Sequence, residues 1–182
     1  MTWRLPAALP PLPDPPRAPT AVFPRPSQQE FRDVLAHLPA GVSVLTTDGA
    51  HGPAGLTASA VCSLSVEPPL LLACVDNRSR TLARLLDHGT FAVNVLRRDQ
   101  TDVARAFADP GTGQDDRFAM VPHRRAEQGA IVFDDALAWL SCRVQDTFPG
   151  GDHTIVTGRV QALSHTHGEP LVWHQRGFRG LA

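Results

Sequence analysis

Residues 55–81, which read GLTASAVCSLSVEPPLLLACVDNRSRT, contain two polar groups separated by an apolar run. The first group consists of hydroxyl side chains that alternate with apolar residues, at Thr57, Ser59, Ser63 and Ser65. The second group, residues 77–81, follows the apolar run that begins after Pro69. Two strands joined by a loop would bring both groups to one rim of a sheet, so this stretch predicts a site as well as a fold.

The side chains of this stretch indicate a phosphate-bearing ligand. Small hydroxyl residues let a ligand approach the backbone closely, and Arg78 and Arg80 can donate paired, charge-assisted hydrogen bonds to an anion. A purely structural interpretation stays open, because alternating serine and apolar residues are also typical of a half-buried strand with one solvated face. Composition alone favours that second interpretation.

Length and charge narrow the class of protein. The chain has 182 residues and a formal net charge of −1, which suits one domain with a tail and does not favour nucleic acid or a membrane as a partner. All 17 basic residues are arginines, whose planar donor forks suit phosphates and carboxylates. Because no membrane-spanning run or signal peptide is recognisable, we expect a cytoplasmic protein.

Neither a disulfide framework nor a metal site is expected. The three cysteines, Cys62, Cys74 and Cys142, are odd in number, widely spaced and set in apolar surroundings, which favours reduced thiols. Three histidines near the end lie among small polar residues with no carboxylate or cysteine at ligand spacing: His165, His167 and His174. We therefore interpret the histidine segment as a solvent-exposed loop.

The first 26 residues predict an arm separate from the folded domain. They contain nine of the 17 prolines, a density that excludes helix and favours an extended or disordered segment. Six apolar residues are spaced along the arm, at Trp3, Leu5, Leu9, Leu12, Val22 and Phe23. The arm is therefore expected to pack on a neighbouring subunit or to remain a tail.

Helix signals occur at three places. Ser27 and Glu30 form a capping box, followed by apolar residues on one helix face and then by Pro39; these residues are Phe31, Val34, Leu35 and Leu38. A second helix is expected from Ser79 to Gly89, and a third from a cap at Asp99 to Phe107.

The remaining pattern predicts six or seven strands. They are expected at 41–47, 54–60, 69–75, 90–96, 136–148, 152–163 and 170–174, with 69–75 covered on both faces and central in the sheet. Pro149-Gly150-Gly151 is interpreted as a turn, and residues 109–125 as a mobile loop over the site. Helices do not alternate strictly with strands, and no GxGxxG or GxxxxGK[ST] motif is present, so a closed or split antiparallel barrel is favoured over a parallel nucleotide-binding sheet.

The order and spacing of four segments resemble the short-chain flavin reductases of two-component monooxygenase systems. The segments are 38–47 (LPAGVSVLTT), 55–72 (GLTASAVCSLSVEPPLLL), 91–96 (FAVNVL) with Gln100 and Phe107, and 151–160 (GDHTIVTGRV). The resemblance covers about residues 31–181. It implies a mainly β domain, residues 27–182, with an antiparallel, Greek-key-like FMN-binding split β-barrel and short helices.

The resemblance also implies an activity and partners. A flavin reductase transfers a hydride from nicotinamide C4 of NADH or NADPH to flavin N5 of FMN or FAD. The reduced flavin then diffuses to a separate monooxygenase. We expect NADH, with NADPH open, and a homodimer whose flavin sites lie near the subunit interface.

Site residues follow from the resemblance by position. Thr57, Ala58 and Ser59 look like the segment that lines the flavin ring and its ribityl chain, although many relatives have serine at the position of Ala58. The edge is extended by Cys62, Ser63 and Ser65, and the phosphate ligands are expected to be Arg78, Ser79 and Thr81.

Two further segments resemble parts of the family's site. Gly151, Asp152 and His153 match a GDH signature whose histidine lies beside the nicotinamide, so His153 is the expected catalytic residue. Phe178 and Arg179 resemble a C-terminal segment that closes over the flavin. Two alternatives stay open: a flavin-binding sensor domain on the same barrel, and an enzyme that uses tightly bound FMN on its own substrate.

Overall fold

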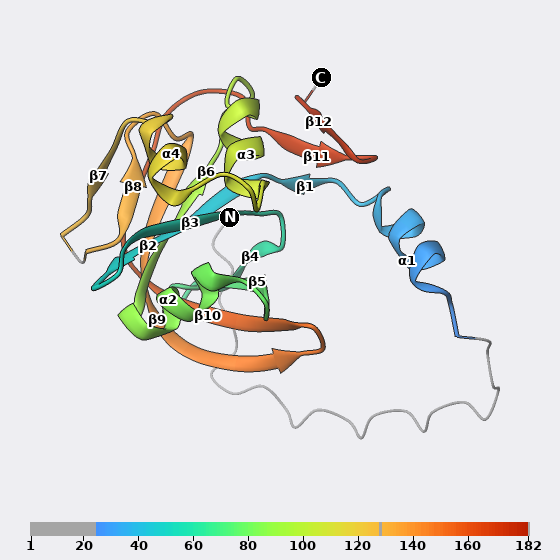
Figure 1. Cartoon of the computed structure of the whole chain (residues 1–182), viewed down its shortest axis with the longest axis horizontal. Coiled ribbons are helices and arrows are strands. Elements are labelled where there is room, and N and C mark those ends of the chain that lie inside the picture. Colours follow the sequence, from blue (N-terminus) through green and yellow to red (C-terminus); the bar gives the residue numbers. More distant parts are fainter. Residues whose placement is uncertain (1–24, 128, 182) are drawn as a thin grey trace.

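The computed structural model describes residues 25–127 and 129–181 and shows a mainly β protein (Figure 1). The helices are α1 (Gln28–Leu35), α2 (Arg80–His88), α3 (Thr101–Ala108) and α4 (Gln114–Ala119). The strands are β1 (Ala40–Gly41), β2 (Ser43–Gly49), β3 (Gly52–Ala58), β4 (Val61–Ser65), β5 (Leu70–Asp76), β6 (Thr90–Val95), β7 (His123–Arg125), β8 (Ile131–Phe133), β9 (Ala138–Gly150), β10 (His153–His165), β11 (Val172–His174) and β12 (Gly177–Arg179). Residues 1–24 of the expected arm lie outside the described residues.

Seven strands form one antiparallel sheet in the order β3-β2-β6-β9-β10-β5-β4. Three hairpins supply six of its strands, and β6 is reached from β5 by a connection through α2 to the far side of the β9–β10 hairpin. Such a return connection is the feature that defines a Greek key. The prediction of a mainly β, antiparallel fold is confirmed.

Side-chain packing closes the sheet where hydrogen bonds do not. Its two edge strands, β3 and β4, are consecutive in the chain and are joined by a corner at residues 59–60. Inside the curve, Ala58 of β3 belongs to the same buried cluster as Ala73 and Val75 of β5. The sheet therefore curls into a split barrel. It stays open between its two edge strands, β3 and β4, which the corner connects but which do not pair with each other.

A second buried cluster attaches the helices to the outside of the sheet. Phe107 of α3 contacts Phe118 edge to face with ring centroids 5.2 Å apart, and it lies 5.5 Å from Phe133 of β8. All three rings are buried, together with Val42 and Leu171. Because burial of such side chains contributes roughly 1.5–3 kcal/mol each, this cluster holds α3 and α4 against the sheet.

Gly55 is the point of closest approach between the sheet and α3. A Cβ atom at this position would lie 2.6 Å from the Phe107 ring and 3.2 Å from the Leu45 carbonyl oxygen, both well inside van der Waals contact. Glycine therefore lets the aromatic ring lie directly on the β3 backbone.

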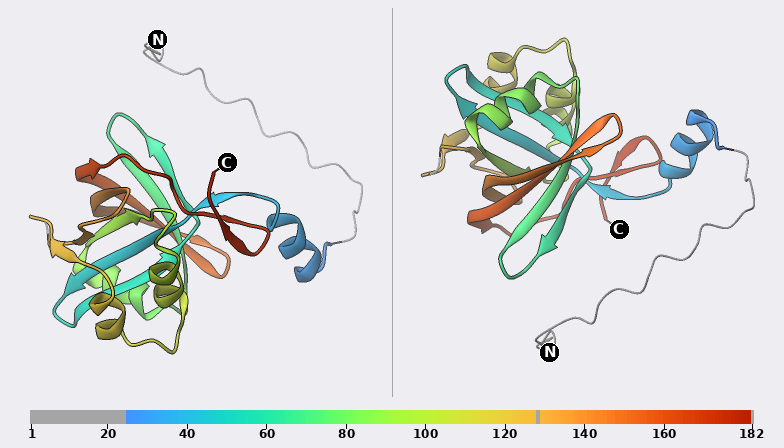
Figure 2. Two further views of the ribbon diagram at one scale, coloured as in Figure 1. Left: turned by 90° about the horizontal axis from the view of Figure 1, so that it is seen from above. Right: turned by 90° about the horizontal axis from the view of Figure 1, so that it is seen from below.

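Helix α1 stands apart from the barrel beside β11 and β12 (Figure 2). Its capping box is present as predicted, with the Glu30 N–H donating to Ser27 Oγ at 3.1 Å and the Ser27 N–H donating to Glu30 Oε2 at 2.8 Å. None of its residues is buried. Its apolar stripe, which we call the α1 stripe, consists of three exposed helix residues and one just beyond the helix end: Phe31, Val34, Leu35 and Leu38.

Several expectations about single elements were wrong. The described residues contain twelve strands rather than six or seven, because a short three-stranded sheet, β1-β11-β12, and a short pair, β7-β8, accompany the seven-stranded sheet. Strand β5 is second from an edge, and burial alternates along it, so only one of its faces is covered. Asp99 does not cap α3: the N-cap residue is Gln100, and the Asp99 carboxylate instead accepts hydrogen bonds from Arg97.

Residues 109–125 form a packed structure rather than the mobile loop expected. They contain α4 and β7. Phe118 and Val121 belong to the second buried cluster, on the outside of the sheet, which we call the outer cluster. The many charges of the segment conceal this short apolar anchor, because six residues are too few to show a helical period.

Substituting Gly55→Ala should destabilise the domain, because the new methyl group must displace Phe107 or the β3 backbone. We expect a loss of about 1–3 kcal/mol in the free energy of unfolding, and roughly 2–4 °C in Tm for each kcal/mol. The matched control is Gly41→Ala, where nothing lies within 4 Å of the new Cβ. Thermal melts that do not separate the two variants would show that the ring does not depend on this glycine.

Candidate functional site

A groove runs along β3 between α3 and the β11–β12 hairpin on one side and α2 and α4 on the other. Its first half is a cavity of about 540 Å³ whose wall includes Thr57, Ser59, Arg105, Trp173, Gly177 and Phe178. Its second half is a cavity of about 740 Å³ whose wall includes Thr57, Arg78, Ser79, Arg80, Thr81 and Arg117. Because Thr57 and Ala108 line both halves, we treat them as one site and call it the β3 groove.

Side chains alternate between the two faces of the sheet along β3 and into the corner, so the three residues predicted to line a ring do not all face the groove. Thr57 and Ser59 line the groove, whereas Ala58 points into the barrel and is buried in its core. The Thr57 hydroxyl donates to the Ala104 carbonyl oxygen of α3 at 2.7 Å, which fixes its rotamer at the junction of the two halves. A serine hydroxyl in place of Ala58 would face an apolar core.

Aromatic rings form the wall of the first half. Trp173 of β11 and Phe178 of β12 meet edge to face with centroids 5.0 Å apart, and the Arg105 guanidinium lies over the Phe178 ring at 5.7 Å. The turn that joins these strands places Gln175 and Arg176 at positive φ, 49° and 57°. Arg179, also predicted to be in the site, is exposed, and its guanidinium donates to the Phe178 carbonyl oxygen.

The start of α2 supplies the predicted phosphate ligands. Ser79 is the N-cap residue and makes no side-chain cap, and it lines the second half of the groove with the first two residues of the helix, Arg80 and Thr81. Thr81 is buried, and its hydroxyl donates to the Gly55 carbonyl oxygen at 3.3 Å.

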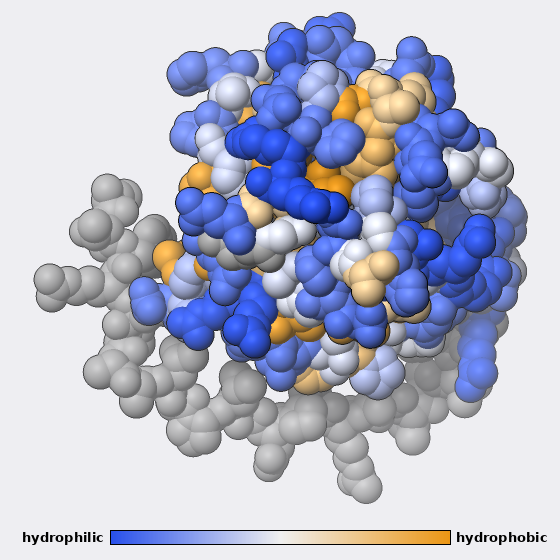
Figure 3. All heavy atoms as spheres, turned by 60° about the vertical axis from the view of Figure 1, so that its left-hand side comes forward, coloured by the Kyte–Doolittle hydropathy of each residue, from blue (hydrophilic) through white to orange (hydrophobic). Residues whose placement is uncertain are grey.

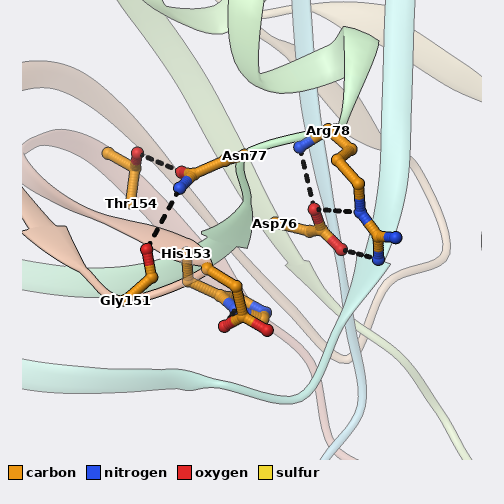
Figure 4. A network of polar contacts seen from close by, with 7 residues as sticks. Asp76, Asn77, Arg78, Gly151, His153 and Thr154 are labelled. Atoms are coloured by element: carbon orange, nitrogen blue, oxygen red, sulfur yellow. Dashed lines mark hydrogen bonds and ion pairs between the residues drawn. The ribbon is translucent and has the colours of Figure 1, made fainter.

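Arg78 is already paired (Figure 4). Its guanidinium donates to both Asp76 carboxylate oxygens at 2.8 and 3.1 Å, while 90% of its side chain is exposed. The side-chain and backbone N–H groups of Arg78 hold the pKa of Asp76 well below its usual range. An anion in the groove must therefore compete with Asp76 for Arg78.

Arg117 of α4 is the cation that the sequence interpretation missed. Only 7% of the residue is exposed, and its Nη1 donates to the Gly55 carbonyl oxygen at 2.9 Å. Its buried Nε has no hydrogen-bond partner among the described residues. Burial lowers the pKa of Arg117, which an anion bound beside it would offset.

Gln114 joins α4 to the same backbone unit. Its amide oxygen accepts from the Gly55 N–H at 2.8 Å, and its amide nitrogen donates to the Gly55 carbonyl oxygen at 3.3 Å. Gly55 is thus held by Thr81, Gln114 and Arg117 at once. Helices α2 and α4 are therefore both attached to one carbonyl oxygen of β3, next to the Leu56 and Thr57 wall of the groove.

His153 lies at the start of β10 and is not among the residues that line the groove; Figure 4 shows it with Asp76 and Asn77. It pairs across the sheet with Asp76, which lines the second half. Its Nδ1 lies 2.7 Å from Asp152 Oδ1, and the bond to His153 lowers the pKa of Asp152. The turn consists of Gly151, at φ 73°, and Asp152, whereas Gly150 still belongs to β9.

Asn77 holds the hairpin next to α2. It accepts from the Thr154 hydroxyl at 2.7 Å and donates to the Gly151 carbonyl oxygen at 3.4 Å, while its own backbone N–H donates to the Asp152 carbonyl oxygen. The GDH segment and the 77–81 segment are therefore brought together.

Cys62, Ser63 and Ser65 are not brought to the β3 groove. They follow the corner at residues 59–60 and lie on β4, where they line a separate cavity of about 520 Å³. The rest of that wall is mainly apolar and includes Val61, Leu70, Leu140, Val160 and Leu163. We call this the apolar cavity.

Comparison with known families gives a match that begins at the end of α1 and covers the β domain. A model of the flavin reductase like domain matches residues 35–182. The chain belongs to this family. The resemblance read from the four sequence segments is thereby confirmed.

Relatives and solved structures agree with this assignment. The chain is 36% identical over 165 residues, 90% of its length, to an FMN reductase (NADH) RutF 2 from Rhizobium rhizogenes. It spans 95% of that protein but only 47% of a longer probable flavin reductase from Rhizobium meliloti.

Two solved structures superpose on most of the chain. One is an NADH:FAD oxidoreductase from Streptomyces globisporus in complex with NAD and FAD fragments, with a TM-score of 0.79 and 36% identity, covering 85% of this chain and 92% of that one. The other is the flavin reductase component of a bacterial two-component tryptophan halogenase, with a TM-score of 0.80 and 33% identity, covering 85% and 98%.

The β3 groove fits a flavin on its own chemistry. One half offers aromatic walls and hydroxyls to a flat ring, and the other offers a helix N-terminus and a buried guanidinium with an unpartnered N–H to a phosphate. In the described part of the chain, no group of three or more His, Cys, Asp or Glu side chains could hold a metal ion. No described helix has the length and apolarity needed to cross a membrane.

Proposed function

We propose that this chain is an NADH-dependent flavin reductase that takes FMN or FAD in the β3 groove. The observation that carries the proposal is the continuity of the groove, in which an aromatic half and a cationic half meet at Thr57. A flavin has the same order of parts, a flat ring joined by a ribityl chain to a phosphate.

The aromatic half suits the ring. Trp173 and Phe178 contribute aromatic rings to its wall, and Thr57 and Ser59 contribute hydroxyl groups. The Thr57 hydroxyl already donates to α3, so it can only accept from a ligand at this position.

The cationic half suits the phosphate. Arg117 is fixed through Gly55, and the N-terminal residues of α2, where the helix dipole favours an anion, line the same cavity. Arg78 can join when an anion displaces Asp76, and an exposed pair of this kind is worth about 0–1 kcal/mol, so the exchange costs little.

Bound flavin supplies the hydride-accepting chemistry, and no protein acid or base is obligatory for it. This chain's residues bind and orient the two substrates and place fixed cations near the groove. Arg105 and Arg117 lie in its two halves and would stabilise negative charge there. Side chains locked by hydrogen bonds cost little reorganisation, which is the main contribution that a protein of this design can make.

We assign His153 to the nicotinamide. With Nδ1–H donating a hydrogen bond to the Asp152 carboxylate, the other ring nitrogen, Nε2, is left to contact the carboxamide of the nicotinamide. The assignment is supported by the position of His153 opposite Asp76 at the edge of the groove and by its partial exposure.

His153→Ala should raise KM for NADH and lower kcat/KM by about 10- to 100-fold, because one orienting contact is lost. Flavin affinity should stay nearly constant. Steady-state kinetics with each substrate varied, together with a thermal melt, separates this role from a structural one. A lower Tm with both substrates disturbed would indicate a strand residue, and unchanged NADH kinetics in a stable variant would remove His153 from the site.

Purified protein mixed with NADH and excess FMN or FAD should turn over free flavin many times. The reduced flavin would then serve a separate flavin-dependent monooxygenase by diffusion, as the resemblance implies. Absorbance of NADH and of oxidised flavin measures the stoichiometry. A single reduction of one retained flavin would support an enzyme that keeps its FMN, and bound flavin without reduction would support a sensor.

We also propose a homodimer, supported by two apolar surfaces. The α1 stripe and the apolar cavity are both open, and Leu163 at the cavity is 62% exposed. The face turned forward in Figure 3 is different, since hydrophobic residues show there mainly in gaps between hydrophilic ones. Exposed apolar areas such as the α1 stripe and the apolar cavity are typical of interaction surfaces.

Sedimentation equilibrium should give twice the chain mass, and Leu163→Asp should shift the equilibrium toward monomer by placing a charge in the interface. Met120→Asp is the matched control, because Met120 is 49% exposed and lies at the end of α4. A fully active monomer would contradict the proposal.

A further inference from the structure

A third cavity opens beyond the phosphate end of the β3 groove. It has a volume of about 550 Å³ and lies between the β2–β3 turn, α2 and α4. Arg80, Thr81, Gln114 and Arg117 line both this cavity and the second half of the groove, so the two spaces adjoin at the cationic end. We call it the arginine cavity, after Arg80, Arg84 and Arg117 in its wall.

The charges of the arginine cavity favour an anion. Three guanidinium groups face two carboxylates, those of Asp115 and Asp116, which are exposed residues of α4. The Asp116 carboxylate folds back toward its own N-cap, where a Cβ on Gly113 would lie 3.2 Å from Oδ2. Arg117 already donates to the Gly55 and Asp109 carbonyl oxygens, and only its buried Nε lacks a partner among the described residues, so Arg80 and Arg84 are the arginines with donors for a ligand.

Arg84 belongs to the arginine cavity alone and can therefore distinguish a ligand there from a ligand in the groove. It lines the arginine cavity and not the groove, and its Nη1 donates to the Pro53 carbonyl oxygen at 3.2 Å. That bond uses one of five donors, which leaves the rest of the fork for a ligand. The wall also contains the planar imidazole ring of His51 and the apolar rings of Pro53 and Pro110.

We propose that the arginine cavity binds the adenylate half of FAD and makes FAD the preferred flavin over FMN. The inference rests on the proposed function. FMN ends at one phosphate, whereas FAD continues through a second phosphate, joined by one bridging oxygen, to adenosine. A second phosphate must therefore lie next to the first, and the arginine cavity is the space that adjoins the first phosphate site. Arg84 contacts only the second phosphate, so it discriminates between the two flavins.

The test is Arg84→Gln, with flavin dissociation constants measured by fluorescence titration. FAD affinity should fall by about 10-fold or more, because a hydrogen bond to a charged group is lost, while FMN affinity should change less than about 2-fold. Arg84→Lys should restore part of the preference because it keeps the charge. Arg143→Gln is the matched control, because Arg143 is an exposed arginine of β9 that lines neither cavity.

Other outcomes contradict the proposal in distinguishable ways. Equal losses for FAD and FMN, or no loss in a stable variant, would overturn it. A selective rise in KM for NADPH would assign the cavity to a 2′-phosphate of the nicotinamide substrate instead. Wild-type protein that binds neither flavin would refute the proposed function itself.

A second measurement needs no variant and covers the case in which Arg84→Gln does not fold. Millimolar AMP should weaken FAD binding to the wild-type chain and leave FMN binding unchanged, since AMP occupies only the arginine cavity. AMP that competes equally with both flavins, or with neither, would overturn the proposal.

Discussion

The site depends on the contact between Gly55 and the Phe107 ring. No larger residue fits there, since an added Cβ would lie 2.6 Å from that ring. The close approach brings α3 and α4 onto β3, and the same peptide then accepts hydrogen bonds from Thr81, Gln114 and Arg117. One backbone unit therefore determines both the packing of the outer cluster and the position of the phosphate-binding groups.

The stretch 55–81 predicted much of this arrangement because its elements are local. It contains most of β3, the corner, β4, β5 and the start of α2, and the side chains of Thr57 on β3 and Ser59 at the corner do line the same half of the groove. The period of two breaks at the corner, where the chain leaves one edge of the sheet and enters the other. Ser63 and Ser65 therefore continue the sequence pattern but line a different cavity, which alternation alone cannot reveal.

The arginines show what the sequence pattern could not reveal. Arg78 and Arg80 stand out in the sequence, yet Asp76, only two residues earlier, pairs with Arg78 and reduces its availability. Arg117 lies in a segment that looks like a charged loop, and its importance arises from a contact with Gly55, 62 positions earlier in the chain. The local signal was the pair Phe118 and Val121, which anchors α4 and buries the neighbouring arginine. A tertiary contact of this kind cannot be predicted from the density of charged residues along the sequence.

The turn between β11 and β12 has a consequence for communication across the molecule. Gln175 and Arg176 are held at positive φ, and both are tied to the first helix: the Gln175 N–H donates to the Ala36 carbonyl oxygen at 2.7 Å, and Arg176 pairs with Asp33. The same turn carries Gly177 and Phe178 into the aromatic end of the groove. Because binding free energies at linked sites are reciprocal, whatever docks on α1 changes the affinity of that end for its ligand to the extent that it shifts the turn. Binding at α1 would therefore be coupled, through this turn, to ligand binding in the aromatic half of the groove.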